Sequence, residues 1–141
     1  MYLNDITESI TSDIRLFSDD CILYRCISSI DDCVALQHDI DTLLAWSNTW
    51  KMHFNPSKCQ VMSVTRQRKR LPFVYRLGEV VLPCVASFTY LGVVISSDLR
   101  WNLHTDMVTA KATRTLNLIR RNLYRCPQNI KSLAYTTLVR A

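Results

Sequence analysis

The sequence predicts an α+β fold, in which short antiparallel strands are followed by helices. Residues 14–25, IRLFSDDCILYR, place a polar Ser-Asp-Asp between two runs of branched and aromatic residues, which is typical of a β-hairpin. Residues 28–50 repeat apolar side chains at steps of three and four, and residues 99–126 return to a helical period. Because strands and helices are grouped rather than alternating, α+β is favoured over a parallel α/β sheet.

The helix predicted for residues 28–50 has clear sequence signals at both ends. Ser29, with Asp32 three residues later, resembles a capping box, and acidic residues in the first turn suit the helix dipole. We expect the helix to end near Asn55-Pro56. Its apolar stripe consists of Cys33, Leu36, Ile40, Leu43, Leu44, Ser47 and Trp50.

Extended structure is expected between residues 59 and 96. Residues 59–65 read as a strand, and residues 73–77 and 80–85 as a hairpin around Gly78-Glu79, with Pro83 near an edge. Residues 87–96 form a further extended run, in which Gly92 suggests a bulge or the close approach of a ligand. The basic residues Arg66, Arg68, Lys69 and Arg70 lie in a connecting loop.

Two helices are predicted in the last third of the chain. Residues 99–126 have an apolar face of Val108, Ala112, Leu116, Ile119 and Leu123, and Cys126-Pro127 closes the helix. A final helix covers residues 129–141 and ends without a cap, as in a truncated chain.

Charge is divided unevenly along the 141 residues. Residues 1–50 carry nine acidic and two basic residues, whereas residues 51–141 carry three acidic and fifteen basic residues. A basic surface attracts phosphate backbones, and an acidic region can hold divalent cations. Two ordinary solvated faces explain the same distribution.

The sequence favours a reduced intracellular protein, in the nucleus or cytoplasm, neither secreted nor inserted in a membrane. Its six cysteines form no Cys-x-x-Cys pair, and several lie in apolar runs, so we expect free core thiols. The N-terminal residues lack a basic segment and a long apolar stretch, which argues against a secretory signal. Trp46, Trp50 and Trp101 are expected in the core, and His38, His53 and His104 have no partners at ligand spacing.

The adjacent carboxylates Asp19 and Asp20 have two interpretations. Aspartate is a favoured turn residue because it hydrogen-bonds its own backbone, and this explains the pair locally. Alternatively, two neighbouring carboxylates beside apolar strands are stabilised by a cation, and carboxylate oxygens are ligands that magnesium prefers.

Three blocks decide between these interpretations: residues 2–25, residues 36–62 and residues 88–123. Together they resemble the C-terminal part of the reverse transcriptase domain of non-LTR (LINE-type) retrotransposons, and the resemblance covers nearly the whole chain. The family usually has Phe-Ala-Asp-Asp at the acidic hairpin, where this chain has Phe17-Ser18-Asp19-Asp20. The resemblance implies the C-terminal half of a polymerase palm at residues 1–98 and the start of a helical thumb at residues 99–141.

The resemblance also implies roles for individual residues. Asp19 would be the principal ligand of Mg²⁺, or of Mn²⁺ in its place, with Asp20 as its neighbour. Lys58 matches a lysine that assists the nucleotide phosphates, although a solvated turn lysine explains it equally. The primer end would be held by Tyr90, Leu91, Gly92 and Val93, for which an ordinary buried strand is the alternative. The template–primer duplex would be contacted by Lys111, Arg114, Arg120 and Arg121, any one of which a solvated helix face also explains.

The family's function is RNA-directed DNA synthesis by two-metal nucleotidyl transfer, with an RNA template, a DNA primer and dNTPs. It requires a further aspartate on an earlier strand, together with the fingers, and this sequence contains neither. Asp5 and Asp13 come too late in the motif order to replace that aspartate. We therefore expect a fragment that is inactive without the missing N-terminal part. The alternatives are a non-catalytic nucleic-acid binder that uses the basic half, and a remnant without a role.

Overall fold

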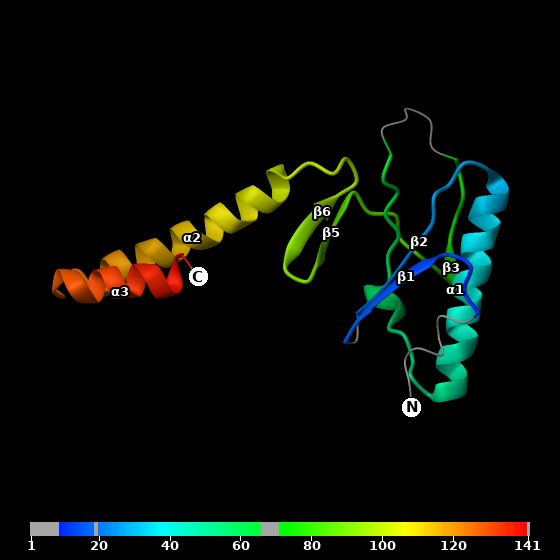
Figure 1. The fold of residues 1–141 in the computed structure, drawn as a ribbon, viewed down its shortest axis with the longest axis horizontal. Helices are drawn as coiled ribbons and strands as arrows, with labels where there is room; N and C mark the ends of the chain where they lie inside the picture. Colours follow the sequence, from blue (N-terminus) through cyan, green and yellow to red (C-terminus); the bar gives the residue numbers. More distant parts are fainter. Residues whose placement is uncertain (1–8, 19, 66–70, 141) are drawn as a thin grey trace. The chain divides into compact units, whose positions relative to one another are not determined.

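The computed structural model describes residues 9–18, 20–65 and 71–140, and the α+β prediction is confirmed in it. Its described elements are three α-helices, one short 3₁₀ helix and three separate two-stranded antiparallel sheets (Figure 1). The chain divides into two compact units, Met1–Val85 and Ala86–Ala141. The predicted boundary between residues 98 and 99 falls inside the second unit and stays a prediction.

The first unit combines the acidic hairpin with the long helix α1 (Figure 1). Strand β1 (Asp13–Phe17) pairs with β2 (Asp20–Tyr24), and α1 covers Ile30–Trp50. Ser29 caps the helix as predicted, because its hydroxyl accepts from the Asp32 amide and the Asp32 carboxylate accepts in return. The helix ends at Trp50, before Asn55-Pro56, because Lys51 adopts a left-handed conformation with φ of 59°.

The predicted hairpin around Gly78-Glu79 is confirmed, but it is short. Strands β3 (Arg76–Leu77) and β4 (Val80–Val81) pair around a turn in which Gly78 has φ of 61°. A Cβ atom at Gly78 would lie 3.2 Å from Leu44 Cδ2 of α1, so the turn packs closely on the helix. Gln37 of α1 holds β3 directly, because its Nε2 donates to the Arg76 carbonyl and its Oε1 accepts from the Arg76 amide, both over 2.9 Å.

Two predictions of extended structure are wrong. Residues 59–65 do not form a strand: Val61 makes an isolated bridge to Cys84, and no regular ladder is formed. Residues 87–96 are not one extended run but a hairpin of β5 (Ser87–Tyr90) and β6 (Val93–Ser96). Residues 66–70, the basic loop, lie outside the described residues.

The second unit packs this β5–β6 hairpin with two helices. Helix α2 covers Asn102–Asn122, and α3 covers Gln128–Leu138 and folds back beside the second half of α2 (Figure 1). The backbone amide of Val94 donates to His104 Nδ1 over 3.3 Å, which ties β6 to the first turns of α2. Ile119 is the buried residue of the predicted α2 face, whereas Val108 is exposed.

Large apolar side chains are widely exposed in the described part of the chain. Its buried apolar residues are Cys33, Leu43, Leu77 and Ile119.

The prediction that all three tryptophans are core residues is wrong, because Trp50 and Trp101 are exposed. Trp46 is half-buried, and its indole N–H has no acceptor among the described residues. The core prediction also fails for Cys26 and Cys84, which are exposed, whereas every described cysteine is free as predicted. No helix of the described ranges is long and apolar enough to cross a bilayer.

Candidate functional site

The acidic hairpin turns tightly between the end of β1 and the start of β2. Phe17 pairs directly with Asp20, and Ser18, the described residue of the turn, has φ of 54°. Two-residue hairpin loops favour such positive φ values, because their twist matches that of the strands. Asp19, the predicted principal metal ligand, lies outside the described residues.

Asp20 begins β2 with an exposed carboxylate. Its cross-strand partner is Phe17, so these two side chains share one face of the hairpin with Arg15, which lies two pairs further along. The Arg15 guanidinium lies 5.8 Å from the centroid of the Tyr24 ring rather than against the carboxylate. No described residue forms a side-chain hydrogen bond or ion pair with the Asp20 carboxylate, which is exposed to solvent.

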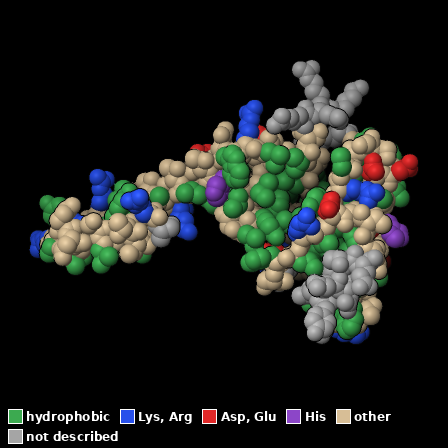
Figure 2. Space-filling view, viewed as in Figure 1, with side chains coloured by type: hydrophobic (Ala, Val, Ile, Leu, Met, Phe, Trp, Pro, Cys, Tyr) green, Lys and Arg blue, Asp and Glu red, His purple; other side chains and the backbone are tan. Residues whose placement is uncertain are grey.

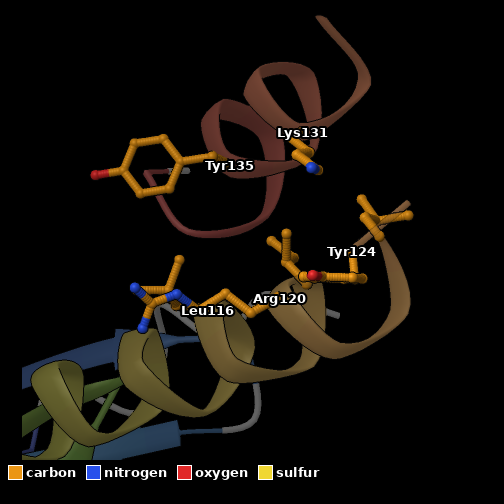
Figure 3. Close-up of a pocket in the computed structure, with 7 residues that line it drawn as sticks. Leu116, Arg120, Tyr124, Lys131 and Tyr135 are labelled. Carbon is orange, nitrogen blue, oxygen red and sulfur yellow. The ribbon is translucent and has the colours of Figure 1, made fainter. Parts of the chain in front are cut away.

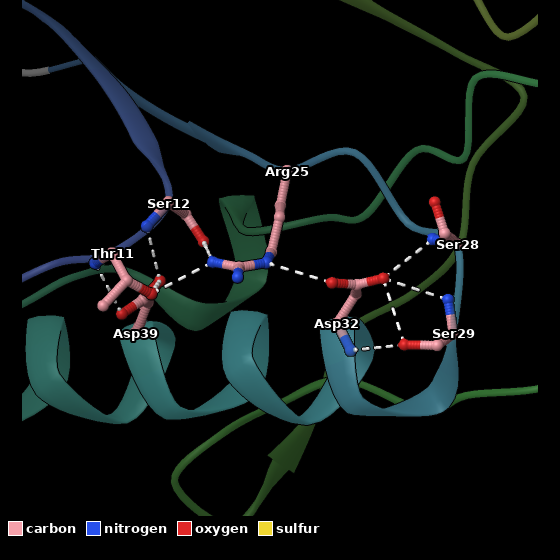
Figure 4. Close-up of polar contacts among 7 residues, drawn as sticks. All are labelled: Thr11, Ser12, Arg25, Ser28, Ser29, Asp32 and Asp39. Atoms are coloured by element: carbon pink, nitrogen blue, oxygen red, sulfur yellow. Dashed lines mark hydrogen bonds and ion pairs between the residues drawn. The ribbon is translucent and has the colours of Figure 1, made fainter.

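The start of the hairpin is held on α1 by a buried carboxylate, Asp39 (Figure 4). The Thr11 amide donates to Asp39 Oδ1 over 3.0 Å. The Thr11 hydroxyl and the Ser12 amide donate to Oδ2 over 3.0 and 2.8 Å. Burial raises the pKa of this carboxyl, but hydrogen bonds from Ser12 and Thr11 outweigh it and leave the pKa below its ordinary value.

The end of the hairpin is held by Arg25 (Figure 4). Its guanidinium Nη1 donates to the hydroxyls of Thr11 and Ser12 over 3.0 and 3.4 Å, and its Nε lies 3.8 Å from Asp32 Oδ1. Backbone hydrogen bonds from Ser28 and Ser29 lower the pKa of Asp32, so this carboxylate stays ionised near Arg25. We call Thr11, Ser12, Arg25, Asp32 and Asp39 the polar clamp. It joins both ends of the hairpin to α1.

Sequence reasoning missed the polar clamp. Asp39 lies four residues before Leu43 on α1 and is fully buried, whereas the predicted apolar stripe passed over it to Ile40. The sequence signal that could have revealed it is an aspartate on the buried side of the helix, because a buried charge requires hydrogen-bonding partners. Its partners Thr11 and Ser12 are more than 25 residues away in sequence.

Lys58 lies at the end of the short 3₁₀ helix Pro56–Lys58 of the first unit. Asn55 begins this turn by accepting from the Ser57 amide, and Pro56 fixes its first position. The Lys58 side chain is exposed, and no described residue pairs with its ammonium group. It is therefore free to contact a phosphate, and equally consistent with a solvated turn lysine.

The predicted primer-binding residues Tyr90, Leu91, Gly92 and Val93 form the turn of the β5–β6 hairpin. Tyr90 pairs with Val93, and Leu91 and Gly92 have φ of 48° and 80°. Gly92 thus serves the turn rather than a bulge, and a Cβ atom there would meet no atom within 4 Å. Leu91 is half exposed at the tip and bears the strain of left-handed backbone, which costs a residue other than glycine about 1 kcal/mol or more.

The four predicted nucleic-acid-binding residues, Lys111, Arg114, Arg120 and Arg121, are all exposed on α2. Helices α2 and α3 contain one acidic residue, Asp106, and none of the described carboxylates forms an ion pair with these four cations. Figure 2 shows Lys and Arg side chains next to hydrophobic ones along these helices. The predicted site residues thus lie in two units: Asp19, Asp20 and Lys58 belong to the first, and the primer-binding and α2 residues belong to the second.

The described residues contain no group of three or more His, Cys, Asp and Glu side chains able to hold a metal ion. Magnesium is often bound through one or two carboxylates, with substrate phosphates and water as the other ligands. The open carboxylate of Asp20 fits one such ligand.

Comparisons with protein-family models, with curated proteins and with solved structures found no match to this chain.

Proposed function

We propose that this chain is part of a non-LTR retrotransposon reverse transcriptase, comprising the end of the polymerase palm and the start of the thumb. The observation that supports this most is the tight acidic turn between two apolar strands, joined at both ends to α1 by the polar clamp. A polymerase needs its carboxylates held rigidly, because two-metal catalysis depends on positioning. The resemblance of three ordered sequence blocks supplies the identity of the reaction.

In this proposal the chain's own residues position the reactants. Magnesium or manganese, when bound, would activate the primer 3′-hydroxyl and neutralise the pyrophosphate leaving group. Asp19 and Asp20 would provide carboxylate ligands, and the Lys58 ammonium would contact the nucleotide phosphates. The β5–β6 turn of Tyr90, Leu91, Gly92 and Val93, with Leu91 and Gly92 exposed, would contact the primer end. The α2 cations Lys111, Arg114, Arg120 and Arg121 would contact the phosphates of the template–primer duplex.

This polypeptide is expected to be inactive alone, because the further aspartate and the fingers are not in its sequence. Purified chain with a primed RNA template, dNTPs and Mg²⁺ should therefore give no extension. Joined to an upstream polymerase segment that carries that aspartate, it should extend the primer, and Asp20→Ala should abolish extension. Robust incorporation by the chain alone that Asp19→Ala removes would contradict the inactivity. Extension by the joined protein that survives Asp20→Ala would contradict the catalytic role.

The second candidate is a non-catalytic nucleic-acid binder that uses the basic second unit. The exposed, unpaired cations of α2 favour it. The logarithm of its affinity for RNA should fall steeply with the logarithm of salt concentration, by about 0.7 to 0.9 per phosphate contacted. Binding with that salt dependence, but without any effect of Asp20→Ala on Mg²⁺ affinity, would favour this candidate over the polymerase.

A further inference from the structure

A groove between α2 and α3 brings apolar, aromatic and basic side chains together. It has a volume of about 340 Å³, near the lower end of the about 300–1,000 Å³ usual for ligand pockets. Leu116 and Ile119 of α2, with Leu123 directly after the helix, form its apolar part. Arg120 of α2, Tyr124 in the turn that follows α2, and Lys131 and Tyr135 of α3 complete it, so each side of the groove has a cation and an aromatic ring (Figure 3).

The two tyrosine rings are more exposed than packing in a protein core requires. Tyr124 is 79% exposed and Tyr135 is 42% exposed, although both line the groove. Aromatic rings at the surface of a basic groove are the usual platforms on which unpaired bases stack. The exposed ring faces are therefore available to stack on a base of a bound ligand.

The charge around the groove selects a polyanion. Beyond Asp106, helices α2 and α3 carry no acidic residue, and Arg120 and Lys131 pair with no described carboxylate. Arg121 and Arg125 extend the basic surface along the same stretch of chain. An acidic peptide would satisfy the cations, but the exposed rings favour a polyanion that also carries flat aromatic groups.

We propose that this groove binds single-stranded nucleic acid, with an unpaired base stacked on Tyr124 or Tyr135 and phosphates contacting Arg120 and Lys131. The inference rests on the nucleic-acid-binding role of the second unit, and it requires nothing of the acidic hairpin. It differs from the proposed function at one residue, since it assigns Arg120 to an unpaired strand rather than to the template–primer duplex. Bases within a duplex are already stacked on one another, so the exposed rings favour unpaired nucleic acid.

Fluorescence anisotropy with the full chain tests the proposal, using a labelled single-stranded oligonucleotide, an abasic phosphodiester of equal length and the matching duplex. Tyr124→Leu and Tyr135→Leu should each weaken binding of the base-containing strand by about fivefold or more, the lower end of base stacking on an aromatic ring. The abasic strand should bind both variants and the original chain equally. Tyr24→Leu, which changes an exposed tyrosine of the first unit, is the matched control and should have no effect.

The cations give a separate readout. Arg120→Gln combined with Lys131→Gln should reduce the slope of log affinity against log salt by about 1.4, because two phosphate contacts to a single strand are lost. Circular dichroism checks that each variant remains helical.

Equal binding of the base-containing and abasic strands by the original chain would overturn the proposal, as would tighter binding of the duplex. Self-association that Tyr124→Leu abolishes in sedimentation would also overturn it, because a second copy would then fill the groove. Any of these results leaves the polymerase assignment standing if Asp20 still governs Mg²⁺ binding. Base-dependent binding without Mg²⁺ binding at Asp20 would instead retain this inference and reject the catalytic proposal.

Discussion

Removing the Asp39 carboxylate should destabilise the first unit more than any change at an exposed carboxylate of α1. Asp39→Ala eliminates three hydrogen bonds to a fully buried group, from the Thr11 amide, the Thr11 hydroxyl and the Ser12 amide. Hydrogen bonds to a charged group contribute about 1.5–3 kcal/mol each. Thr11 is exposed and Ser12 half-buried, so their freed donors reach water. We therefore expect a net loss of about 2–4 kcal/mol.

Urea unfolding followed by tryptophan fluorescence measures this loss, because Trp46 and Trp50 both lie on α1. Asp41→Ala, two residues further along the same helix, is the matched control, and it should cost about 0.5 kcal/mol or less. A cost below about 1 kcal/mol for Asp39→Ala, or equal costs for the two variants, would refute the polar clamp as the anchor of the hairpin.

The same carboxylate predicts a pH dependence. The pKa of Asp39 is lowered in the fold, because its hydrogen bonds outweigh the effect of burial. Its stabilisation is therefore complete above the unfolded pKa of about 3.9 and is lost as pH falls through the lower folded pKa. The difference in unfolding free energy between the original chain and Asp39→Ala should accordingly shrink in acid. A difference that stays constant down to about pH 2 would contradict this assignment.

Three further predictions concern local features. Leu91→Asn should stabilise the second unit by about 0.5–1 kcal/mol and raise its unfolding temperature, since asparagine tolerates φ of 48° better than leucine. Gly92→Ala, at φ of 80°, should destabilise the unit by about 1 kcal/mol and lower its unfolding temperature. An unchanged melting curve for both variants would count against the strained turn. Ser29→Ala should cost about 1 kcal/mol in urea unfolding by removing the capping box, and a cost near zero would argue against it. Burial, with Cys59 nearby, raises the pKa of Cys21 to about 11, so thiol labelling at pH 8 should be much slower at Cys21 than at the exposed Cys26; equal rates would be inconsistent with this burial.

The sequence predicted the elements whose ends are marked by capping residues or turn residues. Helix α1 was predictable because Ser29 and Asp32 cap it and apolar residues recur along one side. The β1–β2 and β3–β4 hairpins were predictable because polar or glycine-containing turns separate their strands. In each case the decisive residues lie within a few positions of one another.

Features that depend on tertiary contacts were not predictable in the same way. The Leu91-Gly92 turn was not predicted because leucine is unusual at positive φ. Apolar residues flank it on both sides, so the sequence of residues 87–96 resembles one strand. Residues 59–65 have strand propensity, but their one bridge, Val61 with Cys84, gives them no ladder. The polar clamp joins Asp39 to residues almost thirty positions away, so no local sequence pattern predicts these hydrogen bonds.

The most direct test of the account is whether the acidic turn binds a divalent cation. In amide NMR spectra of the full chain, titration with Mg²⁺ should shift the signals of Ser18 to Cys21 selectively. Asp20→Asn should abolish these shifts, whereas Asp13→Asn, at the other end of the same hairpin, should leave them unchanged. Absence of selective shifts at millimolar Mg²⁺, or equal loss in both variants, would contradict the proposal that this turn is part of a polymerase active site.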